Sequence, residues 1–127
     1  MSGDSFLLDT NTVLYLLNGD DALTHLLQDK NIFISVITEM ELLCWPGLEE
    51  HSSINKIKKV LEEFTIIGLE NEVKEIAIEF RRKYKLKLPD AIILATANFL
   101  NLPLITGDKK LVVENAGSIV LYKSSLK

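Results

Sequence analysis

The sequence predicts a single α/β domain, a three-layer α/β/α sandwich whose central sheet is mostly parallel and has four or five strands. Short β-branched or apolar runs alternate with longer amphipathic segments along the chain. Parallel strands need crossover connections, which are usually helices, so this alternation favours a parallel sheet covered on both faces. The length agrees, because 127 residues suit one domain with one core, spanning residues 1–127.

Five strands and six helices are predicted. The strands cover residues 6–8, 32–34, 65–67, 104–106 and 119–121. The helices cover 12–17, a segment that carries Leu23 and Leu27, 36 to about 45, 49–63, 70–84, and 89 to about 100. Apolar residues recur at helical spacing in these segments. The last helix is apolar on nearly every side and is therefore expected in the interior.

Composition excludes several classes of protein. Hydrophobic residues make up 47% and charged residues 25%, which is typical of a globular domain and not of a disordered chain or a coiled coil. The single cysteine, Cys44, cannot form an intrachain disulfide and favours a reducing compartment. The first residues lack a basic signal-peptide region, and no apolar run reaches the roughly 20 residues of a membrane helix. A cytoplasmic protein that does not associate with membranes is expected.

Charge and histidine content narrow the chemistry. The formal net charge of −4 is unlike the basic balance of proteins held to nucleic acid by bulk electrostatics, although a local basic strip remains compatible with it. His25 and His51 lie far apart in the sequence and show no ligand-like spacing. Zinc hydrolase and Cys–His nucleophile chemistry are therefore not supported.

Two aspartates follow predicted strands. Asp9 comes directly after the first strand, and Asp108 follows the fourth through Thr106-Gly107. Carboxyl ends of strands line the crevice where α/β sheets bind ligands. A structural role competes at each position, because Asp9 is also a candidate N-cap for the next helix and Gly-Asp is common turn chemistry.

Two further acids lie on predicted helices. Asp90 shares a stripe with Ile93, Leu94 and Ala97, so it is expected to face inward, although an exposed acid in the first turn would also favour the helix dipole. In the third helix, Val36, Ile37, Met40, Leu43 and Cys44 form one apolar arc. Glu39 and Glu41 flank this arc on opposite sides, and helical geometry alone does not choose between them.

Taken together, Asp9, Glu41, Asp90 and Asp108 predict a cation site. Two carboxylates about 4 Å apart repel by roughly 4 kcal/mol at an effective dielectric near 20, so a cluster needs protons or a cation. All-oxygen ligands favour Mg²⁺ or Mn²⁺, which suit phosphodiester hydrolysis. Four polar side chains are candidates for supporting contacts. They are Thr10, Asn11, Ser35 and Thr106.

Four segments also resemble the PIN-domain nucleases, and among them the VapC-type toxins of toxin–antitoxin pairs. They are Leu8-Asp9-Thr10-Asn11, Ser35 to Leu42, Leu88-Pro89-Asp90-Ala91-Ile92, and Leu104-Ile105-Thr106-Gly107-Asp108. Their order and approximate spacing match over nearly the whole chain. The resemblance selects Glu41 rather than Glu39 as the acidic position.

This resemblance implies a Mg²⁺- or Mn²⁺-dependent endoribonuclease that acts on an RNA substrate. The four acids would hold the metal, and Thr10, Asn11 and Thr106 would support them. The resemblance also implies a homodimer and a cognate antitoxin that blocks the site. The segment Lys109-Lys110-Leu111 lacks the second acid and the aromatic residue frequently seen in relatives, which makes Asp108 the least secure of the four.

Two alternatives remain at this point. A PIN-like scaffold could bind RNA or protein without cutting, although a binding surface has no use for mutually repelling carboxylates. A small phosphatase of the haloacid dehalogenase type would need further aspartates where Asn11 and Val112 stand.

A basic segment precedes Asp90. It consists of Arg81, Arg82, Lys83, Lys85 and Lys87, and Lys109 is a possible extension. Cations at a helix end also favour its last carbonyls, so a solvated helix terminus competes with an RNA-binding strip. Trp45, beside Pro46-Gly47, is a candidate either for a partner surface or for the core.

Overall fold

The computed structural model describes residues 4–44 and 51–124 and shows a five-stranded sheet between two layers of helices. The strands are β1 (Ser5–Leu8), β2 (Asn31–Ser35), β3 (Thr65–Ile67), β4 (Leu104–Thr106) and β5 (Ile119–Leu121). The helices are α1 (Thr10–Leu17), α2 (Asp21–Leu27), α3 (Val36–Leu43), α4 (His51–Leu61), α5 (Asn71–Tyr84) and α6 (Leu88–Leu100). A 3₁₀ turn, η1 (Lys109–Leu111), follows β4. The predicted α/β class is confirmed.

The strand order is β3-β2-β1-β4-β5, and each pair of neighbours is parallel. From β1 the chain builds outward through β2 to β3, and it then returns to the other side of β1 to add β4 and β5. Leu8 of β1 pairs with Ile105 of β4 at this reversal. Open α/β sheets bind their ligands at the carboxyl ends of strands where the order reverses, so the ends of β1 and β4 are the expected site.

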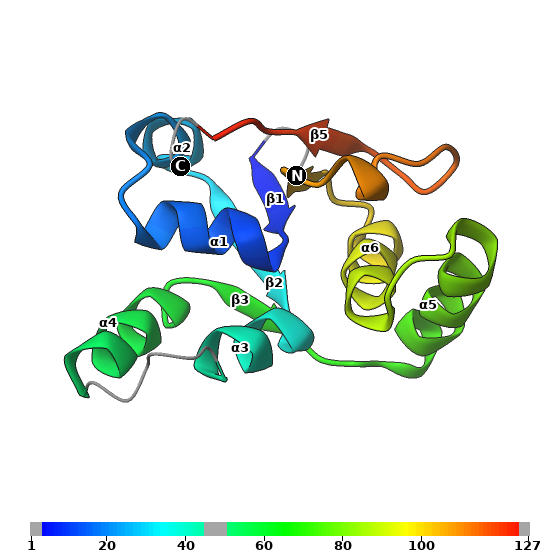
Figure 1. Ribbon diagram of the computed structural model, residues 1–127, viewed down its shortest axis with the longest axis horizontal. Helices are drawn as coiled ribbons and strands as arrows, with labels where there is room; N and C mark the ends of the chain where they lie inside the picture. Colours follow the sequence, from blue (N-terminus) through cyan, green and yellow to red (C-terminus); the bar gives the residue numbers. More distant parts are fainter. Residues whose placement is uncertain (1–3, 45–50, 125–127) are drawn as a thin grey trace.

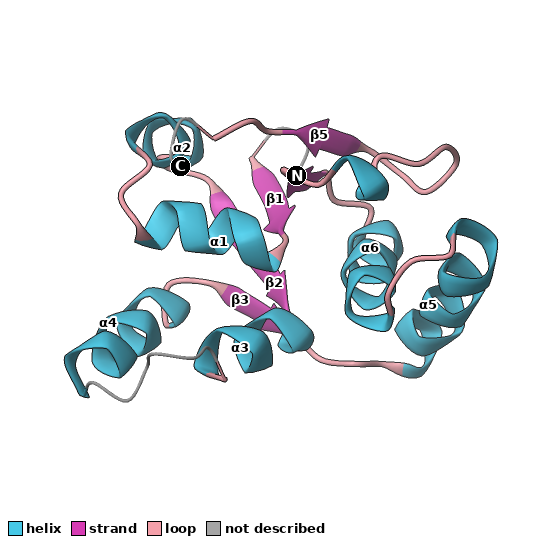
Figure 2. Ribbon diagram, viewed as in Figure 1, coloured by secondary structure: helices cyan, strands magenta, loops and turns pink. Residues whose placement is uncertain are grey.

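Alternating side chains divide the core into two clusters. Leu7 and Leu104 face α5 and α6, whereas Leu8 and Ile105 face the layer formed by α1 to α4. Figures 1 and 2 show the two helical layers on opposite sides of the strands. Side chains one residue apart point to opposite faces of a sheet, so both faces of these central strands must be apolar.

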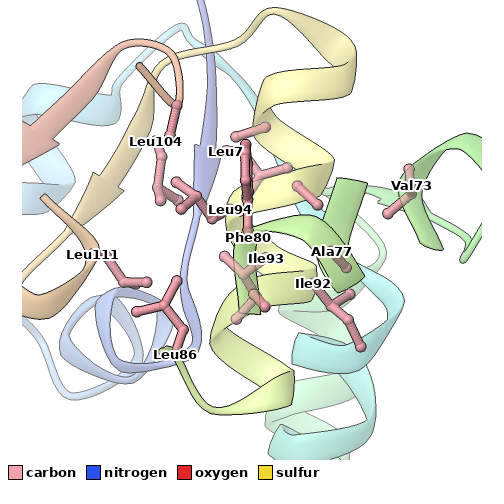
Figure 3. Close-up of a cluster of buried hydrophobic side chains, with 14 of the residues drawn as sticks. Leu7, Val73, Ala77, Phe80, Leu86, Ile92, Ile93, Leu94, Leu104 and Leu111 are labelled. Atoms are coloured by element: carbon pink, nitrogen blue, oxygen red, sulfur yellow. The ribbon is translucent and has the colours of Figure 1, made fainter. Parts of the chain in front are cut away.

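Helix α6 is the most deeply buried helix. Its residues from Ala91 to Ala97 are all buried, and Figure 3 shows Ile92, Ile93 and Leu94 packed among side chains from β1, β4 and α5. Pro89 lies in the first turn, where its missing N–H costs nothing, and Asn101 ends the helix in the left-handed conformation at φ 55°. The interior position predicted from its composition is confirmed.

The apolar arc predicted for α3 is not its buried face. Met40 is 55% exposed and Leu43 39%, whereas Thr38 and Leu42 have no exposure. Leu42 packs in the cluster under α1 to α4, and Thr38 is buried because its hydroxyl joins a polar network described below. The expected end of this helix near Trp45, and Trp45 itself, lie outside the described residues. None of the helices in the described ranges is both long and apolar enough to cross a bilayer.

Candidate active site

The four predicted acids line one pocket of about 320 Å³ at the carboxyl ends of β1 and β4. This acidic pocket is lined by Asp9, Thr10, Asn11, Glu41, Cys44, Asp90, Ile93 and Asp108. Three elements besides the two strand ends supply its walls: the first turns of α1 and α6, and the last turns of α3. Residues far apart in the sequence therefore meet where the sheet topology places a ligand.

Asp9 is the most buried acid of the set, with 5% of its surface exposed. Its Oδ1 accepts a hydrogen bond from the Thr12 backbone N–H at 2.9 Å, which caps α1. Its Oδ2 accepts from the Thr106 hydroxyl at 2.5 Å. Each carboxylate oxygen retains a second lone pair, so capping leaves Asp9 able to bind a cation. The structural and functional interpretations of Asp9 are therefore compatible.

Thr106 connects the two acids that follow the strands. While its hydroxyl donates to Asp9, the same oxygen accepts from the Asp108 backbone N–H at 3.0 Å. The Asp108 Oδ1 in turn accepts from the Lys110 N–H at 2.9 Å, which caps η1. Since Thr106 has no solvent exposure, this chain of hydrogen bonds fixes Asp9 and the start of the Asp108 turn relative to each other.

Glu41 is held by Thr10. The Thr10 hydroxyl donates to the Glu41 Oε1 at 2.6 Å and lies 3.1 Å from the Thr38 hydroxyl, from which it can accept. Glu39, on the same helix, does not contribute to the lining of the acidic pocket among the residues described there. The structure thus places Glu41, and not its neighbour, beside the aspartates.

Burial and the charges of the other three acids both affect Asp90. Its pKa is raised above the ordinary value of 3.8, first by burial and then by the negative charges of Asp108, Glu41 and Asp9, while Lys87 opposes the shift. Ionised carboxylates that face one another without a cation raise each other's proton affinity. The pocket is therefore a place where a proton or a cation lowers the free energy of the folded protein.

Other predicted residues lie around the pocket or away from it. Asn11 is exposed at its edge. Ser35 is buried, and its hydroxyl accepts from the Ile37 N–H at 3.1 Å, so it caps α3 rather than lining the described pocket wall. Cys44 and Ile93 line the pocket, although sequence reasoning treated them as parts of apolar stripes. Thr38, which supports Thr10, was not among the predicted site residues; its signal in the sequence is its place one helical turn before Glu41.

The basic residues lie outside the acidic pocket within the described part of the chain. Ile78, Arg81, Arg82, Lys85 and Leu88 line a separate shallow hollow between the end of α5 and the start of α6. The Arg81 guanidinium donates to the Leu86 carbonyl at 2.6 Å, which gives it a structural role. Lys83 lies 5.3 Å from the centre of the Tyr84 ring. Lys87 is close enough to Asp90 to affect its pKa.

The acidic pocket is smaller than another hollow in the described part of the chain. A larger hollow of about 750 Å³ lies between α2 and α4, where its mixed lining includes Leu16, His25 and Phe64. It brings together no comparable set of interacting acids among the residues that line it. The chemistry of the smaller acidic pocket makes that pocket the better candidate.

Comparisons with known proteins identify the family of the chain. The family model described as "PIN domain" matches residues 6–114. A chain of a toxin–antitoxin complex from Klebsiella pneumoniae is 34% identical, with 90% of this chain and 94% of that chain covered and a TM-score of 0.77. A search of curated proteins gave no match.

More distant structures share the fold. A chain of VapBC2 from Rickettsia felis, crystallised with a DNA fragment from its promoter, is 20% identical, covers 94% of this chain and 99% of its own, and has a TM-score of 0.83. A chain of FitAcB from Neisseria gonorrhoeae is 23% identical, with coverages of 91% and 96% and a TM-score of 0.75. The family expected from the sequence is confirmed by these comparisons.

Proposed function

The chain belongs to the PIN domain family of nucleases, and we propose that it is a metal-dependent endoribonuclease that serves as the toxin of a toxin–antitoxin pair. One observation carries the catalytic part of this proposal. Four carboxylates from four separate segments line a single pocket, where burial and the charges of the other three raise the pKa of Asp90. Such a cluster has little use in a surface that only binds, because the repulsion costs stability.

The donor set fits a hard divalent cation. Asp9, Glu41, Asp90 and Asp108 offer only oxygen ligands, which Mg²⁺ and Mn²⁺ prefer. In residues 4–44 and 51–124, no three His, Cys, Asp or Glu side chains already form a cation site. When bound, the ion would lower the pKa of a water molecule and stabilise negative charge on a phosphate oxygen.

Hydrogen bonds within the chain would orient the acids that hold the ion. Thr12 N–H and the Thr106 hydroxyl fix both oxygens of Asp9, and the Thr10 hydroxyl fixes one oxygen of Glu41. The Lys110 N–H fixes one oxygen of Asp108 in the same way. Asn11, exposed at the edge, would offer an amide to an RNA phosphate or to a water molecule. Support of this kind orients metal ligands and tunes their affinity.

A cognate antitoxin and a second copy of the chain are the proposed protein partners. The similar chain from Klebsiella pneumoniae belongs to a toxin–antitoxin complex, which motivates the first. Met40 and Leu43 on α3 are exposed apolar side chains close to Cys44 of the acidic pocket. A partner that covered them would also restrict access to the acids. A cytoplasmic location is part of the same proposal.

The proposed activity has a direct test. Purified protein incubated with single-stranded RNA and Mn²⁺ or Mg²⁺ is expected to cut the RNA internally, and a chelator is expected to stop cleavage until the metal is restored. Gel analysis of end-labelled RNA and of DNA of the same sequence gives the products and the preference for RNA. Cleavage that persists in the chelator would contradict metal dependence, and an intact RNA in the presence of metal would contradict the activity.

The basic residues from Arg81 to Lys87, here called the basic strip, are proposed to contact RNA phosphates. Arg82→Gln combined with Lys85→Gln is expected to weaken RNA binding and to flatten the dependence of log affinity on log salt by about 0.7 per lost contact. Arg81 is left in place because it holds the Leu86 carbonyl. A matched control replaces two exposed lysines of α4, Lys58 and Lys59, with glutamine. Equal salt slopes for the two double variants, measured by fluorescence anisotropy, would exclude the strip.

A further inference from the structure

A second pocket of about 320 Å³ adjoins the acidic one and has the opposite chemical character. Tyr15, Gly107, Lys109, Tyr122 and Lys123 contribute to its wall, and we call it the lysine–tyrosine pocket. Both lysines are exposed, and both tyrosines are half-buried. The pocket thus presents two ammonium groups and two aromatic side chains within a small volume.

Neighbouring residues of two segments line the two pockets. On α1, Asn11 lines the acidic pocket and Tyr15 lines the lysine–tyrosine pocket, one helical turn or about 6 Å further along. After β4, Asp108 lines the first pocket, while Gly107 and Lys109 on either side of it line the second. A polymer that enters the acidic pocket would therefore meet the lysine–tyrosine pocket with its next unit.

The wall between the aromatic side chains is closely packed. A Cβ atom on Gly107 would lie 3.2 Å from the Tyr122 carbonyl oxygen and 3.5 Å from the Tyr15 ring, so the missing side chain allows this approach. The Tyr122 hydroxyl donates to the Asp20 Oδ1 at 2.9 Å. Because Asp20 is fully buried, this bond holds the Tyr122 ring in place. The pocket is formed before any ligand arrives, which reduces the entropic cost of binding.

The lysines and tyrosines of this pocket suit the phosphate and the base of one nucleotide. Lysine ammonium groups attract phosphate, and a base can stack on an aromatic ring if it is not paired in a duplex. We propose that the lysine–tyrosine pocket binds an unpaired nucleotide of RNA next to the phosphodiester that lies in the acidic pocket. The inference rests on the proposed ribonuclease function and adds to it the pocket and the side chains that would hold the nucleotide beside the cleaved bond. The lysines would also offset the repulsion between the four acids and the RNA.

The lysines provide the first test. Binding of a fluorescein-labelled oligoadenylate is measured by anisotropy in a chelator, so that no cleavage is needed. Lys109→Gln with Lys123→Gln is expected to reduce affinity and to flatten the salt slope by about 1.4, since each phosphate contact to a single strand contributes about 0.7. Lys110→Gln with Lys123→Gln is the matched control, because Lys110 is exposed beside Lys109 but is not part of the described lining. Its expected flattening is about half as large. Equal slopes for the two double variants would overturn the role of Lys109.

The aromatic side chain provides the second test. Tyr15→Leu is expected to weaken oligoadenylate binding about five- to 100-fold and to leave binding of an abasic oligomer unchanged. Phe99→Leu, which changes an exposed aromatic side chain near the carboxyl end of α6, is expected to affect neither. Equal weakening of both oligomers by Tyr15→Leu would show a structural effect and overturn stacking. If Tyr15→Leu fails to fold, the exposed lysines still decide the proposal.

Failure of this inference can be told apart from failure of the proposed function. If the wild-type protein cuts RNA with Mn²⁺ while the variants bind like their controls, only the lysine–tyrosine pocket is misassigned. If the wild-type protein neither cuts nor binds RNA, the ribonuclease proposal fails, and this inference fails with it.

Discussion

Asp90→Asn is expected to raise the thermal stability of the metal-free protein while it removes RNA cleavage. The raised pKa of Asp90 means that its charged form is disfavoured in the folded state. Asparagine has nearly the same shape and carries no charge, so the melting temperature should rise by a few degrees at neutral pH. Cleavage should fall at least about 100-fold, because even indirect support of a metal ligand is worth about 10- to 100-fold.

The sign of the pH dependence follows from the same shift. A folded pKa above the ordinary 3.8 means that the folded protein binds the Asp90 proton more tightly than the unfolded chain. The loss of folding stability caused by the charged form of Asp90 is therefore absent well below pH 3.8. This loss grows as the pH rises through the raised folded pKa of Asp90. The advantage of Asp90→Asn should appear over this window and disappear in acid.

Thermal unfolding in a chelator between about pH 4 and about pH 8 measures this advantage. Glu72→Gln is the control, since it removes an acid from the first turn of α5 without touching the acidic pocket and should slightly lower stability. An Asp90→Asn protein no more stable than wild type at neutral pH would contradict the destabilisation of the Asp90 charge by burial and by the three neighbouring acids.

Asp20→Ala is expected to cause the largest loss of stability among the substitutions considered. Asp20 is fully buried and caps α2 by accepting from the Leu23 N–H at 3.1 Å. It also accepts from the Tyr122 hydroxyl at 2.9 Å and from the Ser124 hydroxyl at 2.5 Å. The side chain therefore joins α2 to the segment after β5, and alanine would remove three hydrogen bonds at once, including the buried one from the Leu23 N–H.

Low pH should weaken the connection that Asp20 makes between α2 and the segment after β5. The Ser124 hydroxyl, against the opposing effect of burial, lowers the pKa of Asp20 below 3.8, and the bonds from Leu23 and Tyr122 add to this. A lowered folded pKa gives stability that is fully present above 3.8 and is lost as pH falls through the folded value. The acid loss seen in wild type should be smaller in Asp20→Ala.

Asp21→Ala is the matched control, because Asp21 is the next residue, is exposed and also lies at the start of α2. Asp20→Ala should melt at least several degrees lower than Asp21→Ala, and the backbone amides of residues 119–124 should exchange hydrogen faster. Equal melting temperatures for the two variants would show that Asp20 does not hold the C-terminal segment.

The sequence allowed the main architecture and the acid set to be predicted. Apolar runs of strand length between amphipathic segments determined the alternation of β1 to β5 with helices, and a parallel sheet follows from that alternation. Asp9 and Asp108 could be placed at strand ends, and Asp90 on an inward stripe, from local pattern alone. The choice of Glu41 over Glu39 came from family resemblance.

Contacts between distant segments could not be predicted. The hydrogen bond from the Thr106 hydroxyl to Asp9 joins residues 97 positions apart, and the sequence around either residue does not predict it. The buried face of α3 was assigned wrongly because Thr38 counts as polar in a periodicity argument. Its hydroxyl is buried only because Thr10 offers it a partner. Likewise, the lysine–tyrosine pocket joins Tyr15 of α1 to Tyr122 beyond β5, which requires the strand order to be known.

The central claim is that the four carboxylates form one divalent-cation site, and Mn²⁺ titration by isothermal calorimetry tests it most directly. Wild-type protein is expected to bind Mn²⁺, Glu41→Gln to bind it at least about 10-fold more weakly, and Glu39→Gln to bind it like wild type. No Mn²⁺ binding by the wild-type protein, or equal binding by the two glutamate variants, would contradict the claim. Absent Mn²⁺ binding together with intact RNA binding would favour a scaffold that does not cut.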